Sequence, residues 1–275
     1  MVTKEVDFQM SRFLGLPLLV ATIGIELVTS GIVRLFLVLL PLLILGVPDS
    51  VLQLAFLVFV WPLLAAVASL LGFPGSTVPR WSLGARRPTQ EEAERLDGAM
   101  DLLAERGAVR PRIFVVDSPM RNAFVTGRIV YVQTSTIHDP YLRATLAHEL
   151  GHANSLDGRI NLALARLTFP GFQNLICWLE MKDLFVAPVL ARMIAGGWAD
   201  RMWPLSALWN WYWRYGEYRA DAYAVELGEG TSLAELLEAY ARPIDSASPF
   251  WRDRSHPFAA QRIDRLRRLQ VRQNA

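Results

Sequence analysis

The chain has 275 residues, a net charge of +2 and an apolar fraction of 52%, with a mean hydropathy of +0.25. Such a small net charge gives no reason to expect a nucleic-acid partner, and the single cysteine excludes an intrachain disulfide. The apolar content is high for a soluble protein, and most of the excess lies in residues 13–73. The composition therefore predicts a mainly α-helical membrane protein.

Residues 13–73 are predicted to form a transmembrane hairpin. The charged residues of this stretch are Glu26, Arg34 and Asp49. A helix crosses a bilayer with about 20 apolar residues, so the stretch can cross twice, with a turn at Pro48–Ser50. The first two charges are expected near the cytoplasmic interface, rather than as a functional pair within the bilayer. We assign 1–73 to this hairpin, in preference to three crossings divided at Ser30-Gly31.

The distribution of arginines predicts the orientation of the hairpin. Seven arginines lie between positions 80 and 112, after the second crossing, whereas the turn carries none. Because basic residues stay on the cytoplasmic side, the N-terminus and the bulk of the chain are expected in the cytoplasm, with the lipid bilayer as a partner. Residues 74–88 are rich in Gly, Pro and Arg, which is typical of a linker.

A helix and short strands are predicted to follow the linker. Thr89 and Glu92 form a capping box at the start of a helix that ends at Arg106-Gly107. Residues 112–117 then favour a strand, and residues 125–133 favour a strand or one arm of a hairpin. These elements predict an α+β domain with a small sheet.

The next predicted helix begins at Asp139-Pro140 and runs to about Ser155, where Asp157-Gly158 closes it. Its sequence HELGH places His148 and His152 four residues apart, on one face of the helix. An HExxH helix is half of a catalytic zinc site, with Glu149 as the general base. The alternative is that both histidines are surface residues or part of a satisfied polar face.

A third metal ligand is expected in the sequence RYGEYRADAYAVELG, residues 214–228. Here Glu217 and Asp221 again stand four apart on a predicted helix, so one carboxylate can bind the metal. The other can accept a hydrogen bond from the outer nitrogen of a ligand histidine. The alternative is a solvated helix face on which Glu217 pairs with Arg214 or Arg219.

Four motifs in this order resemble the HtpX-like membrane zinc metallopeptidases, which are gluzincins related to the CAAX prenyl endopeptidases. They are NAFVTG at 122–127, HELGH at 148–152, EYRADAYA at 217–224 and SHPFAAQRI at 255–263. The resemblance extends over essentially the whole chain. One departure is Phe258, where the family usually has a second proline after its His-Pro pair.

The resemblance implies a role for each matching residue. His148, His152 and Glu217 correspond to the ligands of one zinc ion per chain, and Glu149 to the base. Asp221 corresponds to the partner of a ligand histidine. The segment Asn122, Ala123 and Phe124 is expected to lie beside the substrate cleft, where an extended substrate adds a strand to the sheet edge.

Two residues of the C-terminal motif, His256 and Arg262, correspond to residues that stabilise the oxyanion or lock the site. For His256, a loop-bracing role is an equal alternative. For Arg262, an ion pair with a carboxylate of the Glu217 helix is favoured.

Residues 160–213, between the metal motifs, are predicted to be a membrane-associated or membrane-spanning insertion. Five of the nine tryptophans lie between 198 and 213, as is typical of a membrane interface. Both metal motifs must lie on one side of the membrane, so this region crosses it twice or not at all. A second hairpin is slightly favoured over interfacial helices, and an ordinary buried core is the third alternative.

The predicted protein therefore has a membrane hairpin and a zinc metallopeptidase domain at 89–275, zincin-like, with a small sheet edge and an HExxH active-site helix. It would hydrolyse peptide bonds of membrane or misfolded proteins at the cytoplasmic face of the cell membrane, in membrane protein quality control. The alternatives are a CAAX-type processing protease and a catalytically inactive metal-binding scaffold. A channel with a chance HExxH leaves the later motifs unexplained.

Overall fold

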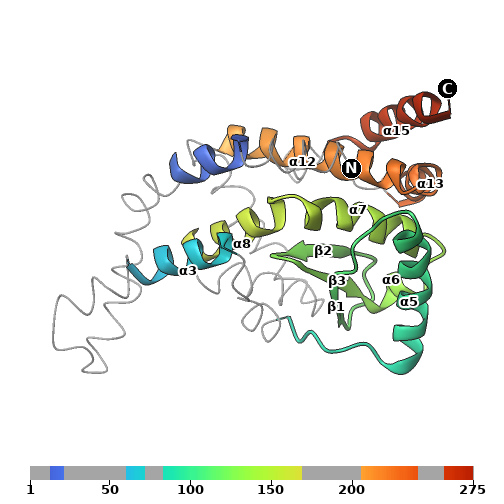
Figure 1. Ribbon diagram of the computed structural model, residues 1–275, viewed down its shortest axis with the longest axis horizontal. Helices are drawn as coiled ribbons and strands as arrows, with labels where there is room; N and C mark the ends of the chain where they lie inside the picture. The colour runs from blue at the N-terminus through green and yellow to red at the C-terminus, as the bar shows by residue number, and fades with distance from the viewer. Residues whose placement is uncertain (1–12, 22–59, 72–82, 169–205, 241–256, 275) are drawn as a thin grey trace.

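The computed structural model describes residues 13–21, 60–71, 83–168, 206–240 and 257–274 (Figure 1). The elements with labels are, in chain order, α3 (Trp61–Leu70), α5 (Gln90–Glu105), β1 (Arg112–Val116), β2 (Ala123–Thr126), β3 (Ile129–Gln133), α6 (Thr134–Ile137), α7 (Leu142–Asn154), α8 (Asp157–Thr168), α12 (Ser206–Glu226), α13 (Gly230–Tyr240) and α15 (Ala259–Asn274). Residues 13–21 form a further helix.

Most of the predicted hairpin and much of the predicted insertion at 160–213 lie outside the described residues, as does His256. Among the residues that are described, no helix combines the length and the apolar character that a bilayer crossing needs. The hairpin and the insertion therefore remain predictions. The mainly helical fold with one small sheet agrees with the sequence.

The sheet has three strands in the order β1-β3-β2, with β3 parallel to β1 and antiparallel to β2. The expected strand at 112–117 is present as β1. The run 125–133 is more than one arm, because Gly127 adopts a φ of +67° and turns β2 into β3. A positive φ strains residues with a Cβ, so glycine suits this turn.

The predicted capping box at the start of α5 is confirmed. The Thr89 hydroxyl accepts a hydrogen bond from the Glu92 backbone N–H, and the Glu92 carboxylate accepts one from the Thr89 backbone N–H. The same carboxylate is buried against Arg86, whose Nη1 and Nη2 lie 2.6 and 2.7 Å from its two oxygens. Arg86 also bonds Asp117, so the end of the linker is tied to both α5 and the sheet.

This ion pair predicts a loss of stability in acid. The hydrogen bond from Arg86 is the main cause that lowers the pKa of Glu92 from 4.5 to about 2. Because the folded pKa lies below the unfolded one, the stabilisation is complete above about pH 4.5 and is lost as the pH falls towards 2. We expect Glu92→Gln to lower the free energy of unfolding by about 2 kcal/mol at pH 7.

Thermal unfolding of the full chain between pH 7 and pH 2 measures this effect. The gap between wild type and Glu92→Gln should close as the pH falls, whereas Glu91→Gln, at an exposed position one residue earlier, should have little effect. A gap that stays constant over the whole range would contradict the role of the Arg86–Glu92 pair.

Helix α7 lies between the sheet and α12 (Figure 1). The two helices approach closely at Gly151, where an added Cβ would lie 2.6 Å from the Cα of Ala220. This glycine lies between the two histidines of HELGH, so its missing side chain lets the histidine-bearing turn sit directly against α12. Helix α7 itself starts at Leu142, slightly later than the predicted Asp139-Pro140.

The end of α7 corrects one prediction. Asp157 and Gly158 were expected to close this helix, but the chain turns at Ser155-Leu156 and Asp157 begins α8. An added Cβ at Gly158 would lie 2.5 Å from the carbonyl oxygen of Gly127, so α8 packs closely against the β2–β3 turn at this position. The backbone N–H of Gly127 also donates to the Gly158 carbonyl at 2.8 Å, so Gly158 serves packing against the sheet.

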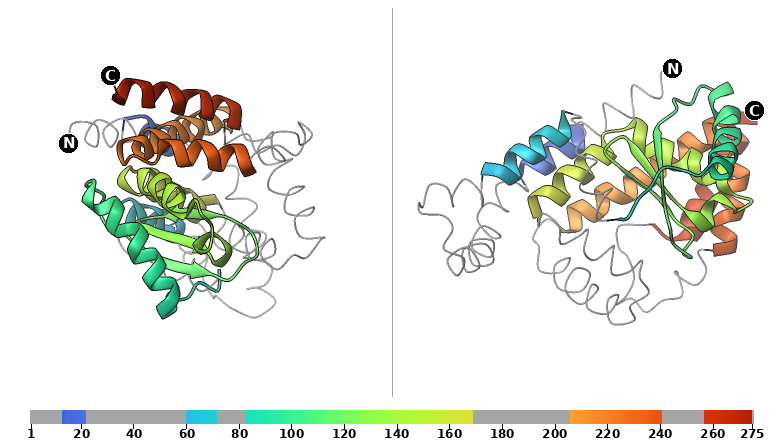
Figure 2. Two further views of the ribbon diagram at one scale, coloured as in Figure 1. Left: turned by 90° about the vertical axis from the view of Figure 1, so that its right-hand side faces the viewer. Right: turned by 90° about the horizontal axis from the view of Figure 1, so that it is seen from below.

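A second group of helices extends away from the sheet (Figure 2). We call helix 13–21, α3, α8 and the first half of α12 the helical bundle. Its apolar core contains the buried side chains of Leu19, Ala66, Leu156, Ile160, Ala163, Trp209 and Tyr212. Helix α8 of the bundle follows the HELGH helix α7 in the chain, and the second half of α12 carries Glu217 and Asp221.

Candidate metal centre

The two histidines of α7 and the glutamate of α12 lie together. His148 Nε2 is 3.5 Å from Glu217 Oε2, and His152 Nε2 is 3.3 Å from Glu217 Oε1. One ligating atom from each of the three side chains fits within a 4.8 Å cluster. Two imidazole nitrogens and one carboxylate oxygen in this arrangement suit a divalent metal ion with an open position.

Each histidine has a carboxylate at its outer nitrogen. His148 Nδ1 lies 3.0 Å from Asp221 Oδ1, and His152 Nδ1 lies 3.3 Å from Asp157 Oδ2. A carboxylate at Nδ1 keeps the proton on that nitrogen and leaves Nε2 free to act as a ligand. Both rings therefore present Nε2 to Glu217.

Arg262 of α15 completes the carboxylate side of the cluster. Its Nη1 is 2.8 Å from Glu217 Oε2, while Nε and Nη2 bond the two oxygens of Asp221 at 2.9 and 2.7 Å. The ion pair expected between Arg262 and a carboxylate of the Glu217 helix is present. Arg262 occupies one oxygen of Glu217, so the other oxygen faces His152.

The electrostatics of the cluster favour a cation. Burial alone would lower the pKa of both histidines, but the carboxylates raise the pKa of His148 above 6.5 and that of His152 to about 10. Burial raises the pKa of Asp157, yet His152 and Arg219 outweigh it and lower that pKa to about 2. Burial opposes ionisation of Asp221 as well, but Arg262 and His148 lower its pKa.

The charges of the cluster fit a divalent ion. Its four carboxylates belong to Glu149, Asp157, Glu217 and Asp221, and its two guanidinium groups to Arg219 and Arg262. With ionised carboxylates and neutral imidazoles, two negative charges remain uncompensated in a buried site. A divalent cation neutralises these two charges when the imidazoles are neutral ligands. Without a cation, protons on the two imidazoles compensate the same charges, because the carboxylates raise the pKa of both histidines.

The centre opens into a cleft of about 520 Å³. Glu149, 7% exposed, lines this cleft together with His148 and His152. Helix α13, which the sequence analysis did not connect with the site, supplies an apolar wall. The wall consists of Leu233, Leu236, Leu237 and Tyr240.

The segment Asn122, Ala123 and Phe124 lines the same cleft. Ala123 and Phe124 belong to β2, which is the last strand of the sheet order and pairs with β3 on one side. At the opposite edge, β1 is covered by an antiparallel bridge between Val115 and Arg86. Within the described part of the chain, β2 is thus the sheet edge beside the metal centre.

Asp157 is the residue of the centre that the sequence analysis missed. Read locally, Asp-Gly after the HELGH helix indicates a helix end. The sequence does place Asp157 five positions after His152. Its partners Tyr212 and Arg219 come much later, on the helix that carries Glu217. No local pattern connects these three positions.

Two histidines and a carboxylate held by outer partners, beside an open cleft, define this site as a candidate divalent-metal centre. Residues 90–270, about two thirds of the chain, match Peptidase family M48. The chain belongs to this family.

Similar proteins include the "Protease HtpX homolog" of Moorella thermoacetica, which is 34% identical over 110 residues, 36% of this chain and 37% of the relative. Another, from Methylacidiphilum infernorum, is 26% identical over 235 residues, 71% of this chain and 75% of the relative. These matches confirm the resemblance to HtpX-like peptidases. The match spans less than half of the length of the Moorella relative.

A comparison of folds finds the crystal structure of S. mikatae Ste24p. It shares 20% sequence identity with this chain, with a TM-score of 0.45, over 90% of this chain and 66% of Ste24p.

Proposed function

We propose that the protein is a zinc-dependent endopeptidase. The observation that carries this proposal is the convergence of His148, His152 and Glu217, with Glu149 in the same cleft. His148, His152 and Glu217 would hold one zinc ion per chain. When bound, zinc polarises a carbonyl oxygen and makes water a nucleophile near neutral pH.

Glu149 is the proposed general base. It follows His148 directly on α7, so its side chain points to a neighbouring part of the same cleft, beside the ligand pair. Its carboxylate accepts the proton of the attacking water and then delivers it to the leaving amine. A buried position in the cleft keeps this carboxylate near the scissile bond.

The substrate is proposed to bind as an extended strand along β2. Asn122, Ala123 and Phe124 line the cleft, and main-chain pairing with a strand edge holds an extended peptide with weak sequence preference. Because the Arg86 bridge covers the edge at β1, the edge at β2 is the one that we assign to substrate.

Asp221 and Arg262 are proposed to hold His148 and Glu217 in place. Asp221 fixes the outer nitrogen of His148, and Arg262 joins Asp221 to Glu217. These contacts support an orienting role for Arg262 over direct contact with the oxyanion. His256, six residues earlier, keeps its two proposed roles, oxyanion stabilisation and bracing of its loop.

We further propose that the helical bundle is anchored in the cell membrane, with the cleft on the cytoplasmic side. Twelve large apolar side chains are exposed among the described residues. Eight of them lie on the bundle or directly at its helix ends: Phe13, Val20, Val60, Leu64, Val67, Leu71, Leu208 and Trp211. Exposed apolar side chains concentrated on one group of helices suit a lipid environment.

Membrane or misfolded polypeptides are the proposed substrates, which corresponds to membrane protein quality control. A CAAX-type processing protease is the alternative within the enzymes. A cleft that opens beside a sheet edge favours extended segments of polypeptide over a single processed terminus. An inactive metal-binding scaffold would have no need of Glu149 in the cleft.

Cleavage of casein by the detergent-purified full chain tests the proposal. We expect hydrolysis that stops on treatment with a chelator and returns on addition of Zn²⁺. Cleavage that persists after removal of all metal would exclude a metallopeptidase. Metal binding without any cleavage of casein or of membrane-protein substrates would favour the scaffold.

A further inference from the structure

Asp157 is a buried carboxylate to which the proposed function gives no role. It begins α8 and is 2% exposed. Its Oδ2 lies 3.3 Å from His152 Nδ1, while its Oδ1 accepts hydrogen bonds of 2.6 Å from the Tyr212 hydroxyl and from Arg219 Nη2. One carboxylate thus joins a candidate metal ligand to two side chains of α12.

Helix α12 is shaped to receive this carboxylate. Tyr212, Gly216 and Arg219 are spaced by four and three residues, so they share one face of the helix. An added Cβ at Gly216 would lie 3.2 Å from Asp157 Oδ2, which is tighter than ordinary van der Waals contact. Glycine at this position therefore lets the carboxylate reach between its two donors.

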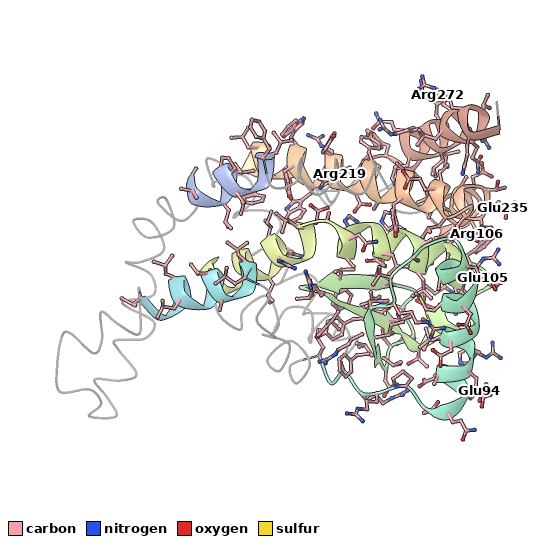
Figure 3. The ribbon with its side chains drawn as sticks, viewed as in Figure 1. Glu94, Glu105, Arg106, Arg219, Glu235 and Arg272 are labelled. Atoms are coloured by element: carbon pink, nitrogen blue, oxygen red, sulfur yellow. The ribbon has the colours of Figure 1, made fainter. Side chains whose placement is uncertain are left out.

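Arg219 is buried beside two tyrosine rings, and its Nη2 is the guanidinium nitrogen that bonds Asp157. It is 6% exposed, and its guanidinium carbon lies 5.8 and 5.2 Å from the ring centroids of Tyr212 and Tyr215. Figure 3 labels Arg219 on α12. A buried guanidinium needs a carboxylate partner, and Asp157 supplies it, so the position of Asp157 follows that of α12.

The helical bundle packs around Tyr212, the residue whose hydroxyl bonds Asp157. Tyr212 is fully buried in the bundle core. On helix 13–21, Gly15 lies directly against its ring, since an added Cβ there would be 2.8 Å from the Tyr212 hydroxyl oxygen. A continuous set of contacts therefore runs from helix 13–21 through Tyr212 and Asp157 to His152.

We propose that Asp157 is a positioning residue for His152 and that Tyr212 makes the metal affinity depend on the packing of the helical bundle. The inference rests on the proposed function, because it requires His152 to be a ligand. It assigns His152 an outer partner supplied by α8, in addition to the Asp221–His148 pair. It also gives the bundle a second role beside anchoring.

The test measures Zn²⁺ affinity of the full chain by competition with a chromophoric chelator, and the visible absorption spectrum of the Co²⁺-loaded protein. We expect Asp157→Asn to weaken Zn²⁺ binding by about 10- to 100-fold, as for other outer partners of ligand histidines. Tyr212→Phe removes a single hydrogen bond and should weaken binding about five-fold. Both variants should shift the Co²⁺ spectrum, because His152 changes its orientation.

Matched variants provide the controls. Tyr218→Phe makes the same chemical change on α12, where the hydroxyl bonds Gln261 near the surface, and should leave affinity and spectrum unchanged. Gly15→Ala should weaken binding because its added Cβ collides with Ile160 Cδ1 and with the Tyr212 hydroxyl, so the bundle must repack around Tyr212. Gly98→Ala should not, because an added Cβ on that turn of α5 meets no atom within 4 Å.

The outcomes separate the inference from the proposed function. If wild type binds Zn²⁺, His152→Ala loses it, and Asp157→Asn and Tyr212→Phe both bind as wild type does, the inference is wrong and the proposed function stands. If wild type binds no Zn²⁺, or His152→Ala binds it equally well, the metal site itself is wrong. If Gly15→Ala fails to fold, the Zn²⁺ affinity of Tyr212→Phe still tests whether Tyr212 links the bundle to the metal centre.

Discussion

Glu149→Gln should strongly reduce peptide cleavage while the protein keeps its metal. The amide has the size of the carboxylate but cannot accept the proton of the attacking water. General-base catalysis contributes about 10²- to 10⁴-fold, so we expect the cleavage rate to fall by that factor. The measurement pairs the rate of casein hydrolysis with the zinc content of the purified variant.

Glu105→Gln is the matched control for this experiment. Glu105 ends α5 at an exposed position (Figure 3), so the same substitution there should leave both cleavage and zinc content at the wild-type values. If Glu149→Gln cleaves at the wild-type rate, Glu149 is not the general base. A variant that loses zinc as well would make Glu149 part of the metal site.

Glu217→Ala should lose the metal. It removes one of the three proposed ligands and leaves two imidazoles from one helix, which hold the ion less tightly. We expect the Zn²⁺ affinity to fall by more than about 100-fold, beyond the range that outer partners produce. Zinc content after dialysis measures the effect directly, and cleavage should be lost with the metal.

The control for this substitution is Glu235→Ala, at an exposed position of α13. It should retain one zinc ion per chain. The substitution at Glu217 also frees Arg262 from one of its two carboxylate partners, so circular dichroism should accompany the metal analysis. A folded Glu217→Ala protein with full zinc content would contradict the proposed ligand set.

The parts of the fold that follow from local spacing could be predicted from the sequence. The capping box of Thr89 and Glu92 depends on residues three apart, and the shared face of His148 and His152 on residues four apart. The spacing of Glu217 and Asp221 likewise made both candidates for the same centre. In each case the helix geometry alone brings the side chains to one face.

The parts that depend on contacts between distant segments could not be predicted in this way. Asp157 meets Tyr212 and Arg219, which lie 55 and 62 positions later, and its local sequence favours a helix end. Tertiary packing overrides that preference, because a buried arginine on α12 needs a carboxylate. The apolar wall of α13 also lacks a local signature, since its leucines pack equally well in an ordinary core.

The centre takes its side chains from a long stretch of sequence: His148 and Arg262 are 114 positions apart. During synthesis on the ribosome, the HELGH helix emerges well before the glutamate that would join it, and the arginine that bonds this glutamate comes later still. An unfinished chain therefore lacks part of the candidate metal centre. The contacts that Arg262 makes with Glu217 and Asp221 can therefore form only after translation has passed residue 262.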